Sequence, residues 1–79
     1  MQLNVLFFGI VADLLGTDTI KMDFSGKNVS DFKEQLVKNH PVLVSYKNYA
    51  VAVNEHYASD ETPLSQGDTI AIIPPVSGG

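Results

Sequence analysis

The sequence of 79 residues contains no cysteine. Disulfides, cysteine-based zinc sites and a thiol nucleophile are therefore excluded. Domains this small often depend on disulfides or a metal, because they bury only about 60% of the surface that the unfolded chain exposes. Here the fold must rely on apolar packing, and a hydrophobic content of 44% makes one small packed domain the expectation.

Basic residues are also scarce. The chain has five Lys plus Arg against nine Asp plus Glu, and its formal net charge is −4. A nucleic-acid-binding domain would carry a basic patch or stripe instead. We therefore expect no nucleic-acid partner, and partners with basic surfaces fit this charge better.

Long apolar runs and targeting segments are missing as well. No run approaches the roughly 20 residues needed to cross a bilayer. The first residues, MQLNVLFFGIVADLLG, lack the charged start and the small-residue cleavage site of a signal peptide. These features predict no membrane partner and a cytoplasmic location.

Catalytic motifs are the last absence. There is no GxxxxGK[ST] phosphate loop, no GxGxxG and no nucleophile elbow around a serine. His40 and His56 stand alone, and a helix end and a turn explain them better than ligand or base roles. Adjacent Asp60 and Glu61 are typical of a solvated loop. The side chains predict no cofactor site, no metal site and no catalysis by this chain alone.

What the sequence does contain is an alternation of apolar and polar residues typical of strands. In the first strand Leu3, Val5 and Phe7 share one face, and Asn4 suggests that the other face is less buried. The stretch before Gly16 predicts a short helical turn or a loop that closes at this glycine, which can act as a cap. The expected strands are 2–9, 17–24, 49–54, a short 57–59 and 69–74.

Residues 28–41 predict the one substantial helix. Asn28 can cap its start, and Val29, Phe32 and Leu36 recur at helical spacing. Pro41 should end it.

The order strand, strand, helix, strand, short strand, strand predicts an α+β domain of the ubiquitin-like β-grasp type. In that fold a mixed sheet of four to five strands carries one main helix on one face, and the first and last strands lie parallel in its centre. A ferredoxin-like alternative would need two full helices. We expect residues 1–74 to form the domain and residues 75–79 an extended tail.

One helix can cover only one face of such a sheet. By alternation Phe8 and Ile73 fall on the uncovered face, and Tyr57 can join them if its strand pairs nearby. Scattered exposed apolar residues are normal in soluble proteins. A cluster of three beside the start of the tail favours a protein interface instead.

The sequence ends in IIPPVSGG. Chain ends are usually frayed and without function. This one follows a core strand directly, and Pro74 and Pro75 favour an extended exit. Gly78 and Gly79 then remove every side chain, which allows close approach to surrounding walls. The segment reaches on the order of 17 Å from Pro75. It suits the delivery of a terminal carboxylate into a narrow partner pocket.

The stretches VLFFG, DLLGT, VAVN, PLSQGD and IIPPVSGG resemble the small subunits of molybdopterin synthases, which are ubiquitin-like sulfur carriers. The resemblance covers the whole chain, and its ending is the most specific part. One departure is visible: many members have Arg-Glu-Leu where this chain has Ala12-Asp13-Leu14. Any partner contact made by that arginine is in doubt here.

The resemblance implies that an adenylating partner uses ATP to activate the Gly79 carboxylate, and that a sulfurtransferase converts it to a thiocarboxylate. The tail then enters the large synthase subunit and passes sulfur to cyclic pyranopterin monophosphate. It also implies an assembly of two small and two large subunits. Phe8, Tyr57 and Ile73, with Pro75 and Val76 of the tail, are the expected partner contacts.

Three other functions remain open from the residues. A sulfur carrier for thiamine or tRNA thiolation would use the same tail chemistry on a different acceptor. A ubiquitin-like modifier would be joined to lysines of target proteins. A plain β-grasp binding module would tolerate a bulky residue at Gly79.

Overall fold

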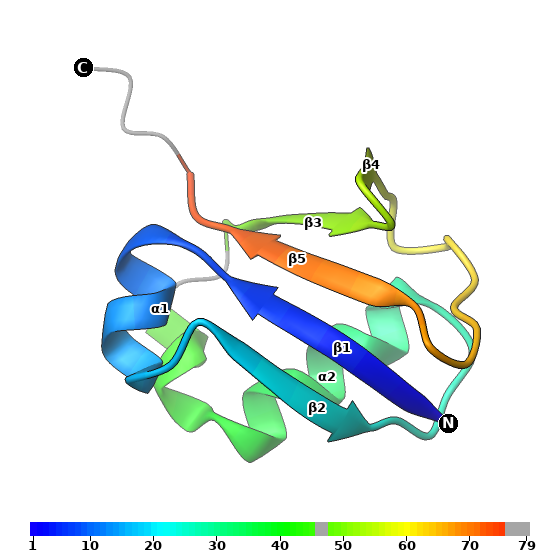
Figure 1. The fold of residues 1–79 in the computed structure, drawn as a ribbon, viewed down its shortest axis with the longest axis horizontal. Helices are drawn as coiled ribbons and strands as arrows, with labels where there is room; N and C mark the ends of the chain where they lie inside the picture. The colour runs from blue at the N-terminus through cyan, green and yellow to red at the C-terminus, as the bar shows by residue number, and fades with distance from the viewer. Residues whose placement is uncertain (46–47, 76–79) are drawn as a thin grey trace.

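The computed structural model describes residues 1–45 and 48–75. It is a five-stranded sheet in the order β2-β1-β5-β3-β4, with helices packed against it (Figure 1). This is the predicted ubiquitin-like β-grasp arrangement. In chain order the elements are β1 (Gln2–Phe7), α1 (Gly9–Leu15), β2 (Thr19–Asp23), α2 (Val29–Asn39), the 3₁₀ helix η1 (Pro41–Ser45), β3 (Ala50–Val53), β4 (His56–Tyr57) and β5 (Thr69–Ile73).

The two central strands, β1 and β5, run parallel, as the sequence predicted. Val5 lies beside Ile70 and Phe7 beside Ile72. β2 pairs antiparallel with β1, and β3 pairs antiparallel with β5. Because β1 and β5 point the same way, both end at the same edge of the sheet, and the chain leaves β5 beside the start of α1 (Figure 1).

Residues Asn54 and Glu55 form the tight turn between β3 and β4. Both have positive φ, 50° and 74°, as the favoured two-residue hairpin turn requires. The prediction that His56 also belongs to the turn was wrong, because a turn of two residues already allows His56 to pair with Val53.

The main helix, α2, begins as predicted at Asn28. The Asn28 side chain accepts a hydrogen bond of 3.0 Å from the backbone N–H of Asp31. The Asp31 carboxylate in turn accepts one of 2.9 Å from the backbone N–H of Lys27. These bonds satisfy donors that a helix start leaves unpaired.

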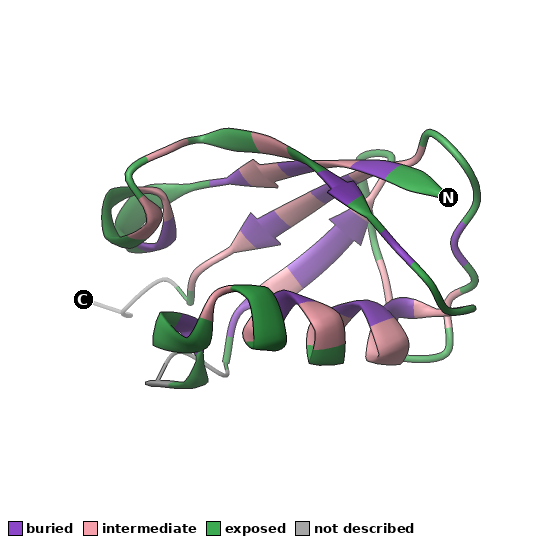
Figure 2. Cartoon of the chain, turned by 90° about the horizontal axis from the view of Figure 1, so that it is seen from below, coloured by how far each residue is buried: buried purple, intermediate pink, exposed green. Residues whose placement is uncertain are grey.

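The core lies between α2 and the inner face of the sheet, as the purple bands in Figure 2 show. From the helix, Val29, Phe32 and Leu36 are completely buried. The sequence reading missed η1, which follows α2 directly and buries Leu43. Proline is tolerated in the first turn of a helix, so Pro41 ends α2 and starts η1.

Candidate functional site

The sheet face that points away from α2 is here called the outer face. Phe8 has extended backbone angles (φ −125°, ψ 155°), so it continues the alternation of β1. By strand register and alternation, the apolar residues of the outer face are Leu6, Phe8, Ala50, Ala52, Tyr57, Ala71 and Ile73.

Large and small side chains alternate across this face. Tyr57 pairs with Ala52, Ala52 with Ala71, and Ala71 with Leu6. The alanines therefore form a low strip between Tyr57 on β4, which is 78% exposed, and Leu6 on β1. Neighbouring strands are about 4.8 Å apart, so Tyr57 on β4 and Leu6 on β1 are separated by three strand spacings, or roughly 14 Å. Ala52 in this strip is itself only 6% exposed.

The sequence placed Phe8, Tyr57 and Ile73 on this face, and the structure locates all three there. Phe8 is 47% exposed, whereas Ile73 is only partly exposed. The three do not lie side by side, because β3 and the small residues of β5 separate Tyr57 from Phe8. The sequence reading did not count the alanines or Leu6 as members of the surface, although the same alternation assigns them to it.

The apolar character of the outer face is concentrated at one end. At the other end of β1, Asn4 lies between Thr69 of β5 and Lys21 of β2. Phe8 and Ile73 lie at the carboxyl ends of their strands, where the chain leaves the sheet. The apolar surface and the start of the tail are therefore adjacent.

The tail begins with two prolines in different environments. Pro74 is partly buried and Pro75 is exposed. Pro74 packs on Gly9, the first residue of α1: a Cβ built on Gly9 would lie 3.0 Å from Cγ of Pro74. Val76, Gly78 and Gly79, which the sequence assigned to the tail, lie outside the described residues. Their roles and the extended tail remain predictions.

Helix α1 extends the apolar surface beside this exit. Ile10 and Leu14, four residues apart, are 46% and 38% exposed. Gly16 caps the end of the helix, as the sequence predicted, and its backbone is in the left-handed conformation. Ala12 is partly buried and packs against the core.

The other titratable candidates lie elsewhere. His40 caps the end of α2 through its backbone N–H, as a helix-end residue, and its ring meets the edge of Phe7. His56 is exposed on β4. Asp60 is exposed, as expected of a solvated loop residue, and it accepts a 2.8 Å hydrogen bond from Nζ of Lys33. These side chains lie apart and do not form a set of acid, base and nucleophile within the described residues.

A hollow formed by α2, η1 and the residue before β3 lies on the opposite side of the molecule from the outer face. It is lined by Lys33, Val37, Leu43 and Tyr49 among others. Burial raises the pKa of the Tyr49 phenol, and the Asp60 carboxylate raises it further. Nζ of Lys33 lies 5.9 Å from the centre of the Tyr49 ring. These contacts attach α2 to the segment before β3.

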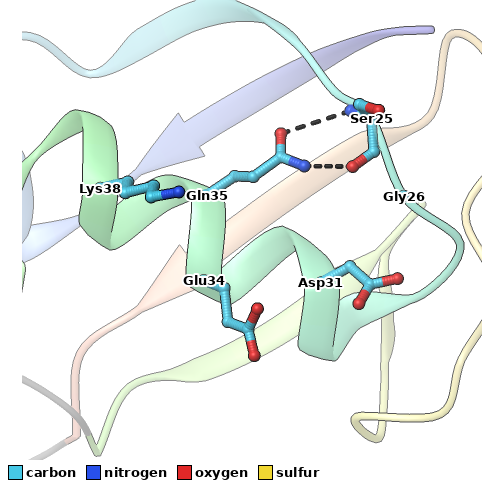
Figure 3. A pocket seen from close by; sticks show the side chains of 6 residues that line it. All are labelled: Ser25, Gly26, Asp31, Glu34, Gln35 and Lys38. Atoms are coloured by element: carbon cyan, nitrogen blue, oxygen red, sulfur yellow. Dashed lines mark hydrogen bonds between the residues drawn. The ribbon is translucent and has the colours of Figure 1, made fainter.

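Figure 3 shows a second hollow, beside α2. The Gln35 side chain accepts a hydrogen bond from the backbone N–H of Ser25 and donates one to its carbonyl oxygen. Both bonds tie the loop after β2 to the helix, and Glu34 and Lys38 line the rim (Figure 3). The arrangement is structural.

Within residues 1–45 and 48–75, no three His, Cys, Asp or Glu side chains are grouped so that they could hold a metal ion. None of the helices in this part of the chain has the length and apolar character needed to cross a membrane.

Comparison with known sequences assigns this chain to a family. The sequence model of the ThiS family matches residues 5–79. The molybdopterin synthase sulfur carrier subunit of Chlamydomonas reinhardtii is 35% identical over 83 residues, which cover 100% of both chains.

Comparison with solved structures agrees. SAMP1, the small archaeal modifier protein 1 of Haloferax volcanii, superposes with a TM-score of 0.87 and 30% identity, covering 100% of both chains. The protein–protein complex of subunits 1 and 2 of the molybdopterin-converting factor from Helicobacter pylori contains a chain with a TM-score of 0.71. That chain is 26% identical, again over 100% of both chains.

Proposed function

This chain belongs to the ThiS family, and from that premise we propose that it is the sulfur carrier subunit of a molybdopterin synthase. The single observation that carries the proposal is the place at which the chain leaves the sheet. β5, after which the sequence runs on to Gly78 and Gly79, ends at the apolar end of the outer face. A partner that docks on this face therefore receives the last residues of the chain at the rim of its own site.

The reacting group is the terminal carboxylate of Gly79. A carboxylate is a poor electrophile, so the adenylating partner joins it to the α-phosphate of ATP and releases pyrophosphate. A sulfurtransferase then supplies sulfur at the oxidation level of sulfide, which forms the C–S bond at the acyl carbon while the C–O bond to AMP breaks. The product is a thiocarboxylate. The absence of cysteine supports this route, because sulfur cannot be carried as a persulfide on this chain.

Sulfur delivery takes place on the large subunit. The tail carries the thiocarboxylate to cyclic pyranopterin monophosphate, and two such transfers supply the two sulfurs of the dithiolene. The large subunit provides the catalytic side chains and a closed site that keeps water from the reactive sulfur. The structure of the Helicobacter pylori relative, a complex of subunits 1 and 2, supports a large-subunit partner.

The outer face is the docking surface for the large subunit and for the adenylating enzyme. Phe8 and Tyr57 are its exposed aromatic anchors, and aromatic residues dominate binding energy at many interfaces. Ile73, Pro75 and Val76 continue the contact along the tail. The assembly contains two small and two large subunits, ATP is bound by the adenylating partner alone, and the location is cytoplasmic.

The mass of the intact protein isolated from cells tests the proposal. We expect a species heavier by the exchange of one oxygen for one sulfur, located at Gly79 by fragmentation. Two results together would refute the proposed sulfur-carrier function. The heavier species would be absent from cells that make molybdenum cofactor, and the purified thiocarboxylate would fail to convert cyclic pyranopterin monophosphate.

Protein modification is the second candidate, favoured by the similarity to small archaeal modifier protein 1. It uses the same activated terminus, with a lysine amine in place of sulfide as the nucleophile. Isopeptide-linked conjugates that persist in a denaturing gel and vanish when Gly79 is deleted would support it. A role in thiamine synthesis or tRNA thiolation is distinguished from the molybdopterin role by supplying each acceptor to the purified thiocarboxylate and measuring which one receives sulfur.

A further inference from the structure

We propose that Gly9 is a positioning residue: it lets Pro74 seat against the junction of β1 and α1 and so sets the direction in which the tail leaves the domain. The expected effect of Gly9 on sulfur transfer rests on the proposed function. The effect of Gly9 on the direction of the tail does not.

The junction brings the two residues together from distant parts of the chain. Phe7 and Ile72 are register partners in the parallel pair of β1 and β5. Two residues further along each strand, Gly9 meets Pro74. A Cβ on Gly9 would lie 3.0 Å from Cγ and 3.9 Å from Cδ of Pro74. Carbon atoms in good contact are about 3.5–4.0 Å apart, so any side chain at Gly9 would press on the ring.

Such pressure would move the tail and not the junction. Gly9 lies between Phe7 and Val11, which are 2% and 0% exposed and hold the junction in the core. Pro74 lies beyond the last residue of β5, and its ring is bonded to its own backbone. Apart from a change of pucker, the ring can yield only if the backbone of the tail moves with it.

The position of Pro74 limits where the end of the chain can reach. The five residues that follow can span at most about 17 Å, so a shift of Pro74 changes the region that the terminal group can occupy. A misplacement of about 1 Å at a reacting group can cost about a hundredfold in rate. Gly9 therefore affects delivery of the terminal group without touching it.

The structure offers a matched comparison for this glycine. Gly9 has a φ of +57° and Gly16 a φ of +71°, a conformation that L side chains rarely adopt. A Cβ on Gly16 would meet no atom within 4 Å. Gly9→Ala and Gly16→Ala therefore share the backbone strain, and only Gly9→Ala presses on the tail.

A spin label measures the exit direction without any partner. The chain has no cysteine, so Ser77→Cys provides a single attachment site. Paramagnetic broadening of the domain's backbone amides then maps where the tail lies. We expect Gly9→Ala to redistribute the broadening, and Gly16→Ala to reproduce the profile of the parent. Identical profiles for Gly9→Ala and the parent would overturn the proposal.

The functional arm uses thiocarboxylates prepared chemically at Gly79, so that no activating enzyme is needed. Single-turnover sulfur transfer on the large subunit is compared with the Kd for that subunit. For Gly9→Ala we expect a rate at least about tenfold lower and a Kd within about threefold. For Gly16→Ala we expect both within about twofold. Equal rates for the two variants would contradict the proposal.

Removing the ring gives a second comparison. Pro74→Ala removes the ring carbons that Gly9→Ala would press upon, so Gly9→Ala should have no further effect in that background. We expect the double variant and Pro74→Ala to transfer sulfur at rates within about twofold of each other, and a double variant much slower than Pro74→Ala would count against the contact. If Gly9→Ala does not fold, Pro74→Ala alone must alter the label profile. If the parent thiocarboxylate transfers no sulfur, the proposed function fails and the label profile alone decides the position of the tail.

Discussion

Phe7 and Phe8 are neighbours in the chain, and they lie on opposite faces of the sheet. Phe7 is 2% exposed and packs in the core, whereas Phe8 is 47% exposed on the outer face. The inner face is filled by large apolar side chains that α2 covers (Figure 2). The outer face has alanines in its centre and no helix over it. The difference indicates that one face stabilises the domain and the other is available to partners.

Deletion of Gly79 is the most severe test of this division. We expect sulfur transfer to be abolished, because the reacting carboxylate is lost from its position, and the melting temperature to stay unchanged. Transfer is measured with purified large subunit, and unfolding by circular dichroism. A lowered melting temperature would mean that the tail contributes to the fold.

Replacing each of the two phenylalanines by alanine compares the faces directly. Phe7→Ala should lower the free energy of unfolding by about 3–5 kcal/mol, because it leaves a cavity in the core. Phe8→Ala should cost about 1 kcal/mol or less, because its ring is already half in solvent. Urea denaturation of both variants measures the difference. Similar losses would show that the outer face also supports the fold.

A charge on the outer face should separate binding from stability. Phe8→Lys is expected to raise the Kd for both the large subunit and the adenylating enzyme by about tenfold or more, which corresponds to about 1.4 kcal/mol. The control Asn39→Lys adds the same charge at the exposed end of α2 and should change neither Kd. Titration calorimetry provides the values. Unchanged affinity of Phe8→Lys would remove Phe8 from the interface.

The smallest expected effect concerns Tyr49, on the inner side. Its pKa is raised above the ordinary 10.0 by burial and by Asp60, so the folded state holds the phenol proton more tightly than the unfolded state. This contribution to stability is complete below about pH 10 and is lost as pH rises through the raised pKa. Tyr49→Phe should therefore flatten the decline of stability in alkali, measured by urea midpoints.

The control for that experiment is Tyr57→Phe on the outer face. Tyr57 is 78% exposed, so its removal takes away a phenol that stays in solvent. We expect the alkaline decline of the parent to persist in this variant. If the two variants behave alike, the burial of Tyr49 is not responsible.

Local patterns were enough to predict most of the fold. The alternation in β1 and β5, the Asn28 cap and the Gly16 cap depend on neighbours within a few residues, and all were predicted correctly. The segment η1 was missed because a single turn carries too few residues to show a period. His56 was misplaced because the sequence did not reveal how few residues closed the turn.

For the candidate site, the sequence by itself predicted the chemistry that we propose, because the absence of cysteine and the pair Gly78 and Gly79 favour the Gly79 carboxylate as the reacting group. Alternation also determined which residues turn away from the core. Only the tertiary structure decided that Ala50, Ala52 and Ala71 form a strip between Tyr57 and Leu6, and that Gly9 supports Pro74. Those contacts join segments more than 60 residues apart at their widest, and they depend on strand order, register and close packing, which no local pattern encodes.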